Sequence, residues 1–420
     1  MPSLVHLLVH LTSAARQHVW LLALILELPL PTLKIVYLSY DGLRQALGSS
    51  QILPYLRGLR DRGISSTVIS LERGVAAPVV SEPGIRCIEL QYRTGGVWAH
   101  LANFRGMLRE LKNILQTERP DVVLARSYLP AAVALRAKKS HGVPYIFDMR
   151  GCWVDERAMG TGSFRNPILY RFGKRFERSL LKNAAGIVTL TKLHAGDLLQ
   201  QKLITSDTPI KVIPTCADFD LFRTDANTDR NGLVIGWIGS VNASYHLAAS
   251  LALFKKVLAL RANAHLQCVT AQPEAILREL KDAQVPQENY SVTSAEHREM
   301  PLLLAKLDWG LLLNENGAGK RGSMPTKLAE FFAAGVRPIQ YGCNPEVADL
   351  VRASGSGIVL RGLSPVDLDQ AAKVIANTQP EEASIEEARR RMRPYFGLEA
   401  GVAAYEDLLK EVSARKGSTA

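Results

Sequence analysis

Short apolar segments alternate with amphipathic segments along most of the chain, and this alternation restricts the fold more than any other feature of the sequence. Apolar runs such as KIVYLSY (34–40) and AGIVTLT (185–191) have the length and composition of buried strands. Segments with helical periodicity separate them, as in LPAAVALRAKKSHG (129–142). Strands that are joined through helices run parallel, so the sequence predicts an α/β fold with doubly wound parallel sheets.

The alternation is interrupted once, at CADFDLFRTDANTDRNG (216–232), which has few residues suited to a core. We therefore predict an N-terminal Rossmann-like domain over 34–215, a connector over 216–232 and a second Rossmann-like domain over 233–395. A final helix and tail, 396–420, can cross back to the first domain. Two such domains face a cleft, and ligands bind at the carboxyl ends of the strands.

The first 33 residues do not fit this pattern. They are apolar, but Arg16, Gln17, His18 and Glu27 divide them into pieces shorter than the ~20 residues of a membrane-spanning helix. They also lack the basic start and the cleavage site of a signal peptide. Two interpretations remain, a helix at a membrane surface and a translated leader upstream of the true start. We favour the leader.

The positive charge of the chain is concentrated in its first half. The net charge is +11, from 51 Lys and Arg against 40 Asp and Glu. Residues 1–183 hold 25 of those cations and 13 of those acids, which gives +12 for that half alone. An anionic membrane surface, a nucleic acid or a merely solvated basic surface would each explain the excess. The chain has no aromatic-rich basic strand and no Lys-rich tail, so we predict no nucleic-acid partner.

The five cysteines are scattered and never spaced as C-x-x-C. They are typical of reduced, small apolar residues of a cytoplasmic protein, and they favour neither a disulfide framework nor a zinc site. The nine histidines show no ligand spacing either. We predict no structural or catalytic metal.

Polar residues cluster at one helix start, in GSMPTKLAEFFAAGVRPIQYG (322–342). Pro325 suits a first turn, and Gly335 suits a helix end. The residues that need explanation are Ser323, Thr326 and Lys327 at the start and Glu330 one turn later. Lys327 could be an exposed first-turn lysine, but the helix dipole disfavours a cation there. Glu330 could be a solvated helix residue, although apolar neighbours surround it in the sequence.

SMPTKLAEFFAAGVRPI resembles the donor-binding segment of GT-B glycosyltransferases, most closely glycosyltransferase family 4. In that family the helix start binds the nucleotide diphosphate and the glutamate binds the ribose hydroxyls. The resemblance assigns these roles to the 323–327 segment and to Glu330. Free N–H groups at a helix start attract phosphate, Lys327 adds a charge, and a carboxylate accepts hydroxyl donors.

Further segments resemble the same family in the same order. KVIPTCADFDLF (211–222) is similar to the interdomain signature, with Cys216 where glycine is usual. AAGIVTLTKLHAGDL (184–198) and LVIGWIGS (233–240) are similar to family strands, and 38–63 resembles the first loop and helix. YIFDMRGCWVDE (145–156) resembles a subgroup segment. The resemblance implies a GT-B fold across most of the chain after residue 33.

The donor site departs from the family pattern at two places. Many members carry E-x(7)-E, whose first glutamate contacts the donor sugar, but Gly322 occupies that position here. The loop after Gly239 and Ser240 lacks the cation that many members direct at the diphosphate. Gly239-Ser240 forms either a plain turn or a phosphate contact. Lys320 and Arg321 could supply the missing charge from a neighbouring loop.

The first domain departs as well. The histidine that is common in the family has no match, and Asp148 or Arg150 stands about where it would lie. These two residues are candidate catalytic groups with Lys327; the alternative is an Arg–carboxylate pair with a structural role. Gly48, Ser49 and Ser50 form either an N-domain loop that contacts ligand or the cap of the following helix.

The resemblance implies transfer of a sugar from a nucleotide-diphosphate sugar with retention at the anomeric carbon. It needs no cofactor and no metal, because the helix dipole and basic residues neutralise the leaving diphosphate. The subgroup suggests cell-surface polysaccharide assembly on a glycan or lipid-linked acceptor, by a cytoplasmic protein peripheral to the inner membrane. Two alternatives remain, a GT-B sugar-nucleotide epimerase and a non-catalytic, degenerate nucleotide-binding protein.

Overall fold

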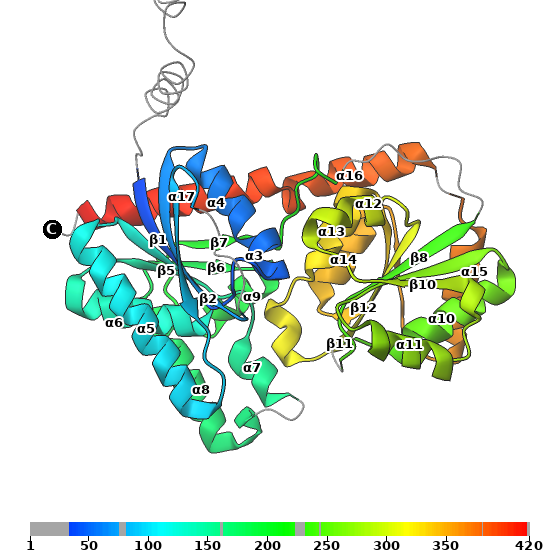
Figure 1. Ribbon diagram of the computed structural model, residues 1–420, viewed down its shortest axis with the longest axis horizontal. Helices are drawn as coiled ribbons and strands as arrows, with labels where there is room; N and C mark the ends of the chain where they lie inside the picture. The colour runs from blue at the N-terminus through cyan, green and yellow to red at the C-terminus, as the bar shows by residue number, and fades with distance from the viewer. Residues whose placement is uncertain are drawn as a thin grey trace, which may run out of the picture.

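The computed structural model describes residues 33–74, 81–159, 163–222, 232–242, 245–379 and 381–417. The predicted leader lies outside these ranges, apart from residue 33, which begins the first strand. Figure 1 shows two α/β lobes side by side, with the last helices running along one side of both. Among the helices of the described ranges, none combines the length and the hydrophobicity that crossing a bilayer requires.

The N-terminal lobe is built on a seven-stranded sheet with the order β3-β2-β1-β4-β5-β6-β7. All its neighbouring strands pair in parallel. The strands are β1 (Leu33–Ser39), β2 (Ile64–Glu72), β3 (Ile85–Gln91), β4 (Val122–Arg126), β5 (Tyr145–Asp148), β6 (Gly186–Thr189) and β7 (Ile210–Val212). The central strands β4, β5 and β6 are buried along their whole length, as a doubly wound sheet requires, whereas the edge strands β3 and β7 are mostly half-buried.

Helices cover both faces of this sheet. One core cluster joins the sheet to α5 (Gly96–Thr117), α6 (Tyr128–His141), α8 (Pro167–Asn183) and α9 (Lys192–Gln200). A second cluster, on the opposite face, joins it to α4 (Leu53–Arg60) and α17 (Leu398–Gly417). The first face thus carries helices from the N-terminal half, and the second face is completed by the end of the chain.

The C-terminal lobe has a six-stranded parallel sheet with the order β10-β9-β8-β11-β12-β13. Its strands are β8 (Leu233–Ile238), β9 (Ala264–Val269), β10 (Tyr290–Thr293), β11 (Trp309–Asn316), β12 (Arg337–Cys343) and β13 (Ile358–Val359). One face packs against α10 (Leu247–Leu260), α11 (Pro273–Asp282) and α15 (Pro365–Asn377). The other carries α12 (Met300–Leu304), α13 (Thr326–Ala334), α14 (Pro345–Ser354) and α16 (Glu382–Phe396).

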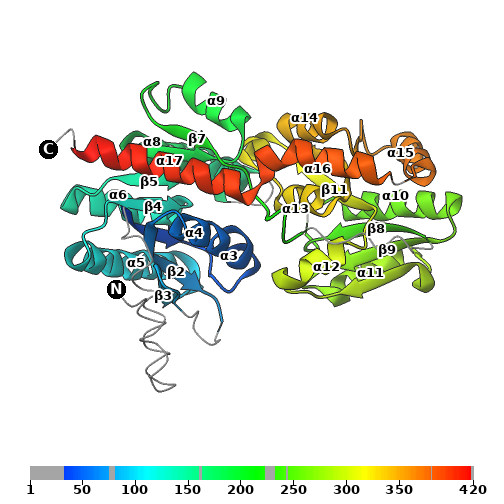
Figure 2. The same ribbon diagram turned by 90° about the horizontal axis from the view of Figure 1, so that it is seen from above.

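The end of the chain links the two lobes. Helix α16 packs on α13 and α14 in the C-terminal lobe, and α17 continues onto α4, β4 and β7 in the N-terminal lobe. Figure 2 shows this pair spanning the molecule from above. At the junction, Ala217 N–H donates to the Phe396 carbonyl, and Leu398 N–H donates to the Ala217 carbonyl, each at 2.9 Å. The predicted fold class is confirmed.

Three local features differ from the sequence predictions. The predicted loop at Gly48, Ser49 and Ser50 is a short helix, α3 (Ala46–Gln51). Helices α7 (Trp153–Ala158) and α16 were not predicted. Phe219 and Phe222 of the connector are buried, although we expected few core residues there. At α3, a Cβ atom on Gly48 would lie 2.2 Å from the Gly42 carbonyl oxygen, so this helix forms where glycine allows close packing.

The remaining regular segments are short 3₁₀ turns. They are η2 (Ser163–Arg165), η3 (Gln287–Asn289), η4 (His297–Glu299) and η5 (Ala318–Gly322). The turn η4 precedes α12 and lines the cleft between the lobes, whereas η5 precedes α13 and contacts α7 and α9 of the N-terminal lobe.

Candidate active site

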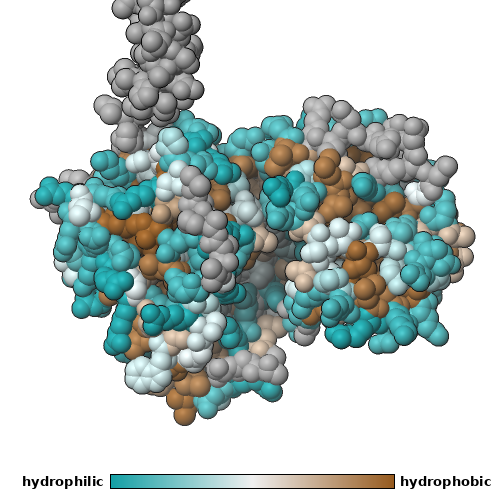
Figure 3. Space-filling view, viewed as in Figure 1, coloured by the Kyte–Doolittle hydropathy of each residue, from teal (hydrophilic) through white to brown (hydrophobic). Residues whose placement is uncertain are grey.

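A cleft of about 920 Å³ lies between the two lobes. Figure 3 shows the surface hollowed between them. Helices α3 and α4 line the N-terminal side, and η4 and α13 line the C-terminal side. The polar side chains that face it are Arg44, Ser49, Ser50, Gln51, Arg57, Asp61, Asp218, Glu296, His297, Arg298, Glu330 and Glu399. The cleft therefore brings together Ser49 and Ser50 of the first singled-out segment and Glu330 of the second.

Helix α13 starts at Thr326, directly after Pro325, and no side chain caps it. Leu328, Phe331 and Phe332 bury its inner face against the C-terminal core. An uncapped helix start leaves backbone N–H groups that can bind an anion. The apolar spacing predicted this helix correctly, and its open end is the feature that a phosphate would use.

Glu330 lies one turn into α13 and lines the cleft with only 7 % of its surface exposed. The interpretation of Glu330 as a solvated helix residue is therefore wrong. Its Oε1 lies 3.5 Å from Nε2 of His297. A carboxylate in this position can accept hydrogen bonds from a ligand in the cleft, with His297 orienting it.

Lys327 lies beside the first loop of the C-terminal lobe. Its Nζ is 4.0 Å from the centre of the Tyr245 ring. A Cβ atom on Gly239 would lie 2.8 Å from the same Nζ, so the glycine makes room for the ammonium group. Burial lowers the pKa of Lys327 to about 8, while the Glu330 carboxylate acts in the opposite direction. Ser240 is exposed, and its Oγ accepts a hydrogen bond from Asn242 Nδ2 at 2.9 Å.

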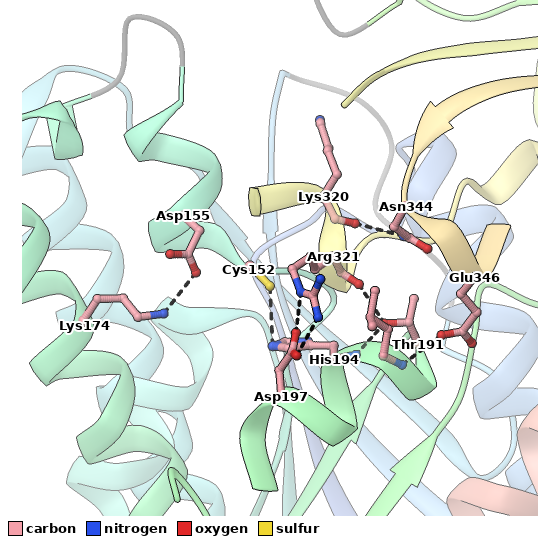
Figure 4. A network of polar contacts seen from close by, with 11 residues as sticks. Cys152, Asp155, Lys174, Thr191, His194, Asp197, Lys320, Arg321, Asn344 and Glu346 are labelled. Atoms are coloured by element: carbon pink, nitrogen blue, oxygen red, sulfur yellow. Dashed lines mark hydrogen bonds and ion pairs between the residues drawn. The ribbon is translucent and has the colours of Figure 1, made fainter. Parts of the chain in front are cut away.

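The turn η5 before α13 contacts the N-terminal lobe through ion pairs and hydrogen bonds (Figure 4). Arg321 donates from Nε and Nη2 to the two carboxylate oxygens of Asp197 in α9, both at 2.7 Å. Thr191 Oγ1 donates to the Arg321 carbonyl at 2.9 Å. The guanidinium group that we expected near a diphosphate is thus paired with the opposite lobe. Lys320 extends away from this network in Figure 4.

Ser323 also contacts the opposite lobe. Its Oγ donates to Oε1 of Glu156 in α7 at 3.2 Å. Burial raises the pKa of Glu156, and Lys320 counteracts that shift. Of the predicted donor residues, Ser323 and Arg321 therefore face the domain contact, whereas Lys327 and Glu330 lie beside each other on α13.

Gly322 is packed against two N-terminal side chains, and this explains the departure from E-x(7)-E. A Cβ atom there would lie 2.8 Å from Cys152 Sγ and 2.8 Å from His194 Nδ1. Cys152 Sγ lies 3.4 Å from His194 Nε2. Burial lowers the pKa of His194 to about 4, so the imidazole is neutral at pH 7. In this arrangement of the lobes, position 322 has no space for a carboxylate.

Asp148 and Arg150 lie at the carboxyl edge of the N-terminal sheet, as expected, but neither lines the cleft. Asp148 is fully buried and accepts a hydrogen bond from the Tyr405 hydroxyl of α17 at 2.8 Å. Its carboxylate oxygens lie 3.7 Å from Arg126 Nη1 and 3.7 Å from Arg150 Nη1. This geometry fits the structural alternative, a buried ion-pair cluster beneath α17.

The serines of α3 line the cleft, but their hydroxyls bond within the helix. Ser50 Oγ donates to the Ala46 carbonyl at 2.6 Å, and Ser49 Oγ donates to the Gln45 and Ala46 carbonyls at 3.3 and 3.2 Å. A ligand can therefore use these oxygens as acceptors or displace the internal bonds. Gly48 serves the close packing of α3 described above.

Sequence reasoning missed two residues of the C-terminal site, Tyr245 and His297. Tyr245 follows β8, and His297 follows β10, both beyond the carboxyl ends of their strands. That position, where α/β proteins bind ligands, was the available signal. In the part of the chain that the structure describes, no group of three or more His, Cys, Asp or Glu side chains could hold a metal ion. That transfer needs no metal stays a prediction.

Comparison with known proteins gives a family match over part of the chain and a fold for most of it. Residues 49–216 match the family described as the glycosyl transferase 4-like domain. No curated protein matches the chain. Sucrose-phosphate synthase from Thermosynechococcus elongatus superposes with a TM-score of 0.74 at 11 % identity, over 91 % of this chain and 100 % of that one.

Two further solved structures have the same architecture. HepE from Anabaena, in complex with UDP and glucose, superposes with a TM-score of 0.64 at 12 % identity, over 91 % of this chain and 100 % of that one. WaaG, a glycosyltransferase of lipopolysaccharide biosynthesis, gives a TM-score of 0.65 at 15 % identity, over 89 % and 99 %. At these identities the likeness shows the fold alone. The chain therefore has the fold of these glycosyltransferases, and its residues 49–216 match the glycosyl transferase 4-like domain.

Proposed function

We propose that the protein transfers a sugar from a nucleotide-diphosphate sugar to a glycan or lipid-linked glycan during cell-surface polysaccharide assembly. One observation carries this proposal: the uncapped start of α13, with Lys327 in its first turn and Glu330 one turn later at the cleft. The helix start and Lys327 would bind the diphosphate, and Glu330 would accept the two ribose hydroxyls.

The donor is a uridine nucleotide in this proposal. HepE, which shares the fold, has been solved in complex with UDP and in complex with UDP-glucose. In this chain the base would extend from Glu330 toward η4, where His297 already contacts the carboxylate. The proposal does not specify which sugar the nucleotide carries.

During transfer, the bond between the anomeric carbon and the diphosphate breaks, and a bond from that carbon to an acceptor hydroxyl oxygen forms. The negative charge that develops on the departing diphosphate is the largest electrostatic demand on the site. Lys327, Lys320 and the helix start would meet it without a metal. The proton of the acceptor hydroxyl leaves to a phosphate oxygen or to water.

Retention at the anomeric carbon is proposed from the family resemblance. Gly322 lies where many members place a sugar-binding glutamate, and Cys152 and His194 occupy the space around it. No carboxylate at this position can act as a nucleophile, so a front-face displacement held by the diphosphate itself is the route that we propose.

The test is release of UDP from UDP-sugars, measured with and without glycan and lipid-linked acceptors, for the wild type and for Glu330→Gln. The proposal expects acceptor-dependent release that Glu330→Gln reduces at least tenfold and that Glu274→Gln, an exposed helix-start control, leaves unchanged. Conversion of a UDP-sugar alone would instead indicate an epimerase. Nucleotide binding without turnover of any donor would indicate a degenerate, non-catalytic protein and overturn the proposal.

A further inference from the structure

Large apolar side chains are exposed at the starts of α5 and α8. Val97 and Trp98 are each 79 % exposed, and Ile168 and Phe172 are 65 % and 66 % exposed. Leu169 and Phe176 add to the same face of α8. Figure 3 shows hydrophobic surface at the lower tip of the N-terminal lobe, where Figure 1 places α8. Exposed groups of this size usually mark a binding surface.

The exposed side of α8 is both apolar and basic. Ile168, Phe172 and Phe176 follow one another at a spacing of four residues and form an apolar stripe, with Leu169 beside it. A parallel stripe of exposed cations adjoins it, formed by Arg171, Arg175, Arg178 and Lys182. Helical geometry puts the two stripes next to each other on the side that faces away from the sheet.

No acid offsets these cations on α8. Its one carboxylate, Glu177, is buried, accepts a hydrogen bond from the Tyr128 hydroxyl at 2.6 Å and pairs with Lys174. Within the described ranges, none of the four cations of the basic stripe forms an ion pair. The face therefore presents unneutralised positive charge beside exposed aromatic rings.

The starts of α5 and α8 lie at the same edge of the molecule. Both helices pack on one face of a parallel sheet, with α6 between them, and each runs back from the carboxyl ends of the strands. Trp98 and Ile168 therefore project from one edge of the N-terminal lobe. We call the exposed side chains of these two helix starts, with the basic stripe, the α5–α8 surface.

We propose that the α5–α8 surface docks the protein onto an anionic lipid bilayer. The apolar side chains would enter the region between headgroups and acyl chains, and the cations would contact lipid phosphates. A second copy of the chain fits less well, because two such basic faces would repel each other. The inference deepens the proposed function, since docking here would hold the cleft toward a lipid-linked acceptor, but bilayer binding itself requires no transfer activity.

The experiment measures co-sedimentation of the full chain with vesicles of 70:30 phosphatidylcholine and phosphatidylglycerol, and with vesicles of phosphatidylcholine alone. We expect binding to the anionic vesicles that weakens with added salt. Ile168→Ser with Phe172→Ser should reduce the partition coefficient by roughly tenfold or more. Arg171→Gln with Arg175→Gln should reduce the partition coefficient about 25-fold, because each charge contributes about fivefold. This loss is expected on the anionic vesicles only.

Matched controls lie on the opposite lobe. Leu302 and Val366 are 68 % and 64 % exposed, so Leu302→Ser with Val366→Ser removes a similar apolar area elsewhere. Arg278→Gln removes an exposed cation of α11. These variants should bind vesicles as the wild type does. All seven substitutions, the four in α8 and the three controls, should leave UDP binding in solution unchanged, which separates failure of docking from failure of the proposed function.

The proposal is overturned if the wild type does not bind anionic vesicles, or if the control variants lose as much binding as the α8 variants. It is also overturned if sedimentation equilibrium shows a dimer that Ile168→Ser with Phe172→Ser dissociates, because the surface would then belong to a second copy of the chain.

Discussion

The charged side chains at the carboxyl edges of the two sheets differ in what surrounds them. In the N-terminal lobe, Asp148 is completely buried, and α17 covers it through the Tyr405 hydroxyl. In the C-terminal lobe, Lys327 and Glu330 lie on an uncapped helix beside the cleft. Both lobes have the same doubly wound architecture, so the fold alone does not decide which edge binds ligand.

The difference lies in what covers each edge. The last helix of the chain crosses from the C-terminal lobe and fills the back of the N-terminal sheet, where it completes a core. In the C-terminal lobe, by contrast, Glu330 of α13 lines the cleft between the lobes. A charged cluster at a strand end therefore stabilises the fold when a helix covers it, and it is available to a ligand when none does.

The largest expected effect comes from a substitution that breaks the buried ion-pair cluster around Asp148. Asp148→Asn leaves Arg150 buried beside a neutral group and Arg126 with Asp41 alone, and removing one partner of a buried ion pair costs about 3–5 kcal/mol. Urea unfolding followed by tryptophan fluorescence would measure the loss. Asp369→Asn, which breaks a surface pair with Lys256, should cost less than about 1 kcal/mol.

The comparison would be wrong if Asp148→Asn kept the wild-type unfolding midpoint but lost transfer activity. Asp148 would then act on the substrate, as the sequence allowed, and both edges would contribute to catalysis.

The site on α13 should change its charge within a pH range that a binding experiment can cover. Burial lowers the pKa of Lys327 to about 8, so the ammonium loses its proton as the pH rises through 8. The diphosphate binds the protonated form, and its affinity should be level below pH 8 and fall by up to about tenfold per pH unit above it. Calorimetry with UDP between pH 7 and 9.5 checks this, and Lys327→Met should bind weakly with no such fall.

The smallest expected effects are changes in UDP affinity when Lys320 or Arg321 is substituted, and they should differ between the two residues. Arg321 is held by Asp197 of the opposite lobe, so Arg321→Ala should change UDP affinity by less than about twofold and stability by less than about 1 kcal/mol. Lys320→Ala should weaken UDP binding by up to about fivefold, because its ammonium points away from that network. The reverse order, measured by the same calorimetry, would place Arg321 at the diphosphate.

Local features of the sequence predicted the fold class and helix α13. The alternation of strands and helices is a short-range pattern, and the polar residues at and before the start of α13 lie within eight positions of one another, from Ser323 to Glu330. Their grouping on one helix start required no knowledge of tertiary contacts.

The remaining features depend on residues far apart in the chain. Asp197 meets Arg321 across 124 positions, and Tyr405 reaches Asp148 across 257. The packing of Gly322 against Cys152 and His194 is equally remote in sequence. Without these contacts, the sequence could not show that Asp148 is covered or that Arg321 is already paired.

The central claim is that the start of α13 receives a nucleotide diphosphate with Glu330 on the ribose. Calorimetric binding of UDP, GDP, ADP and UMP to the wild type and to Glu330→Ala tests it most directly. We predict selective binding of UDP, stronger than UMP, and a loss of roughly tenfold to a hundredfold in Glu330→Ala from the charged hydrogen bonds removed. Folded protein that binds none of the diphosphates, or binds UDP equally well without Glu330, would contradict it.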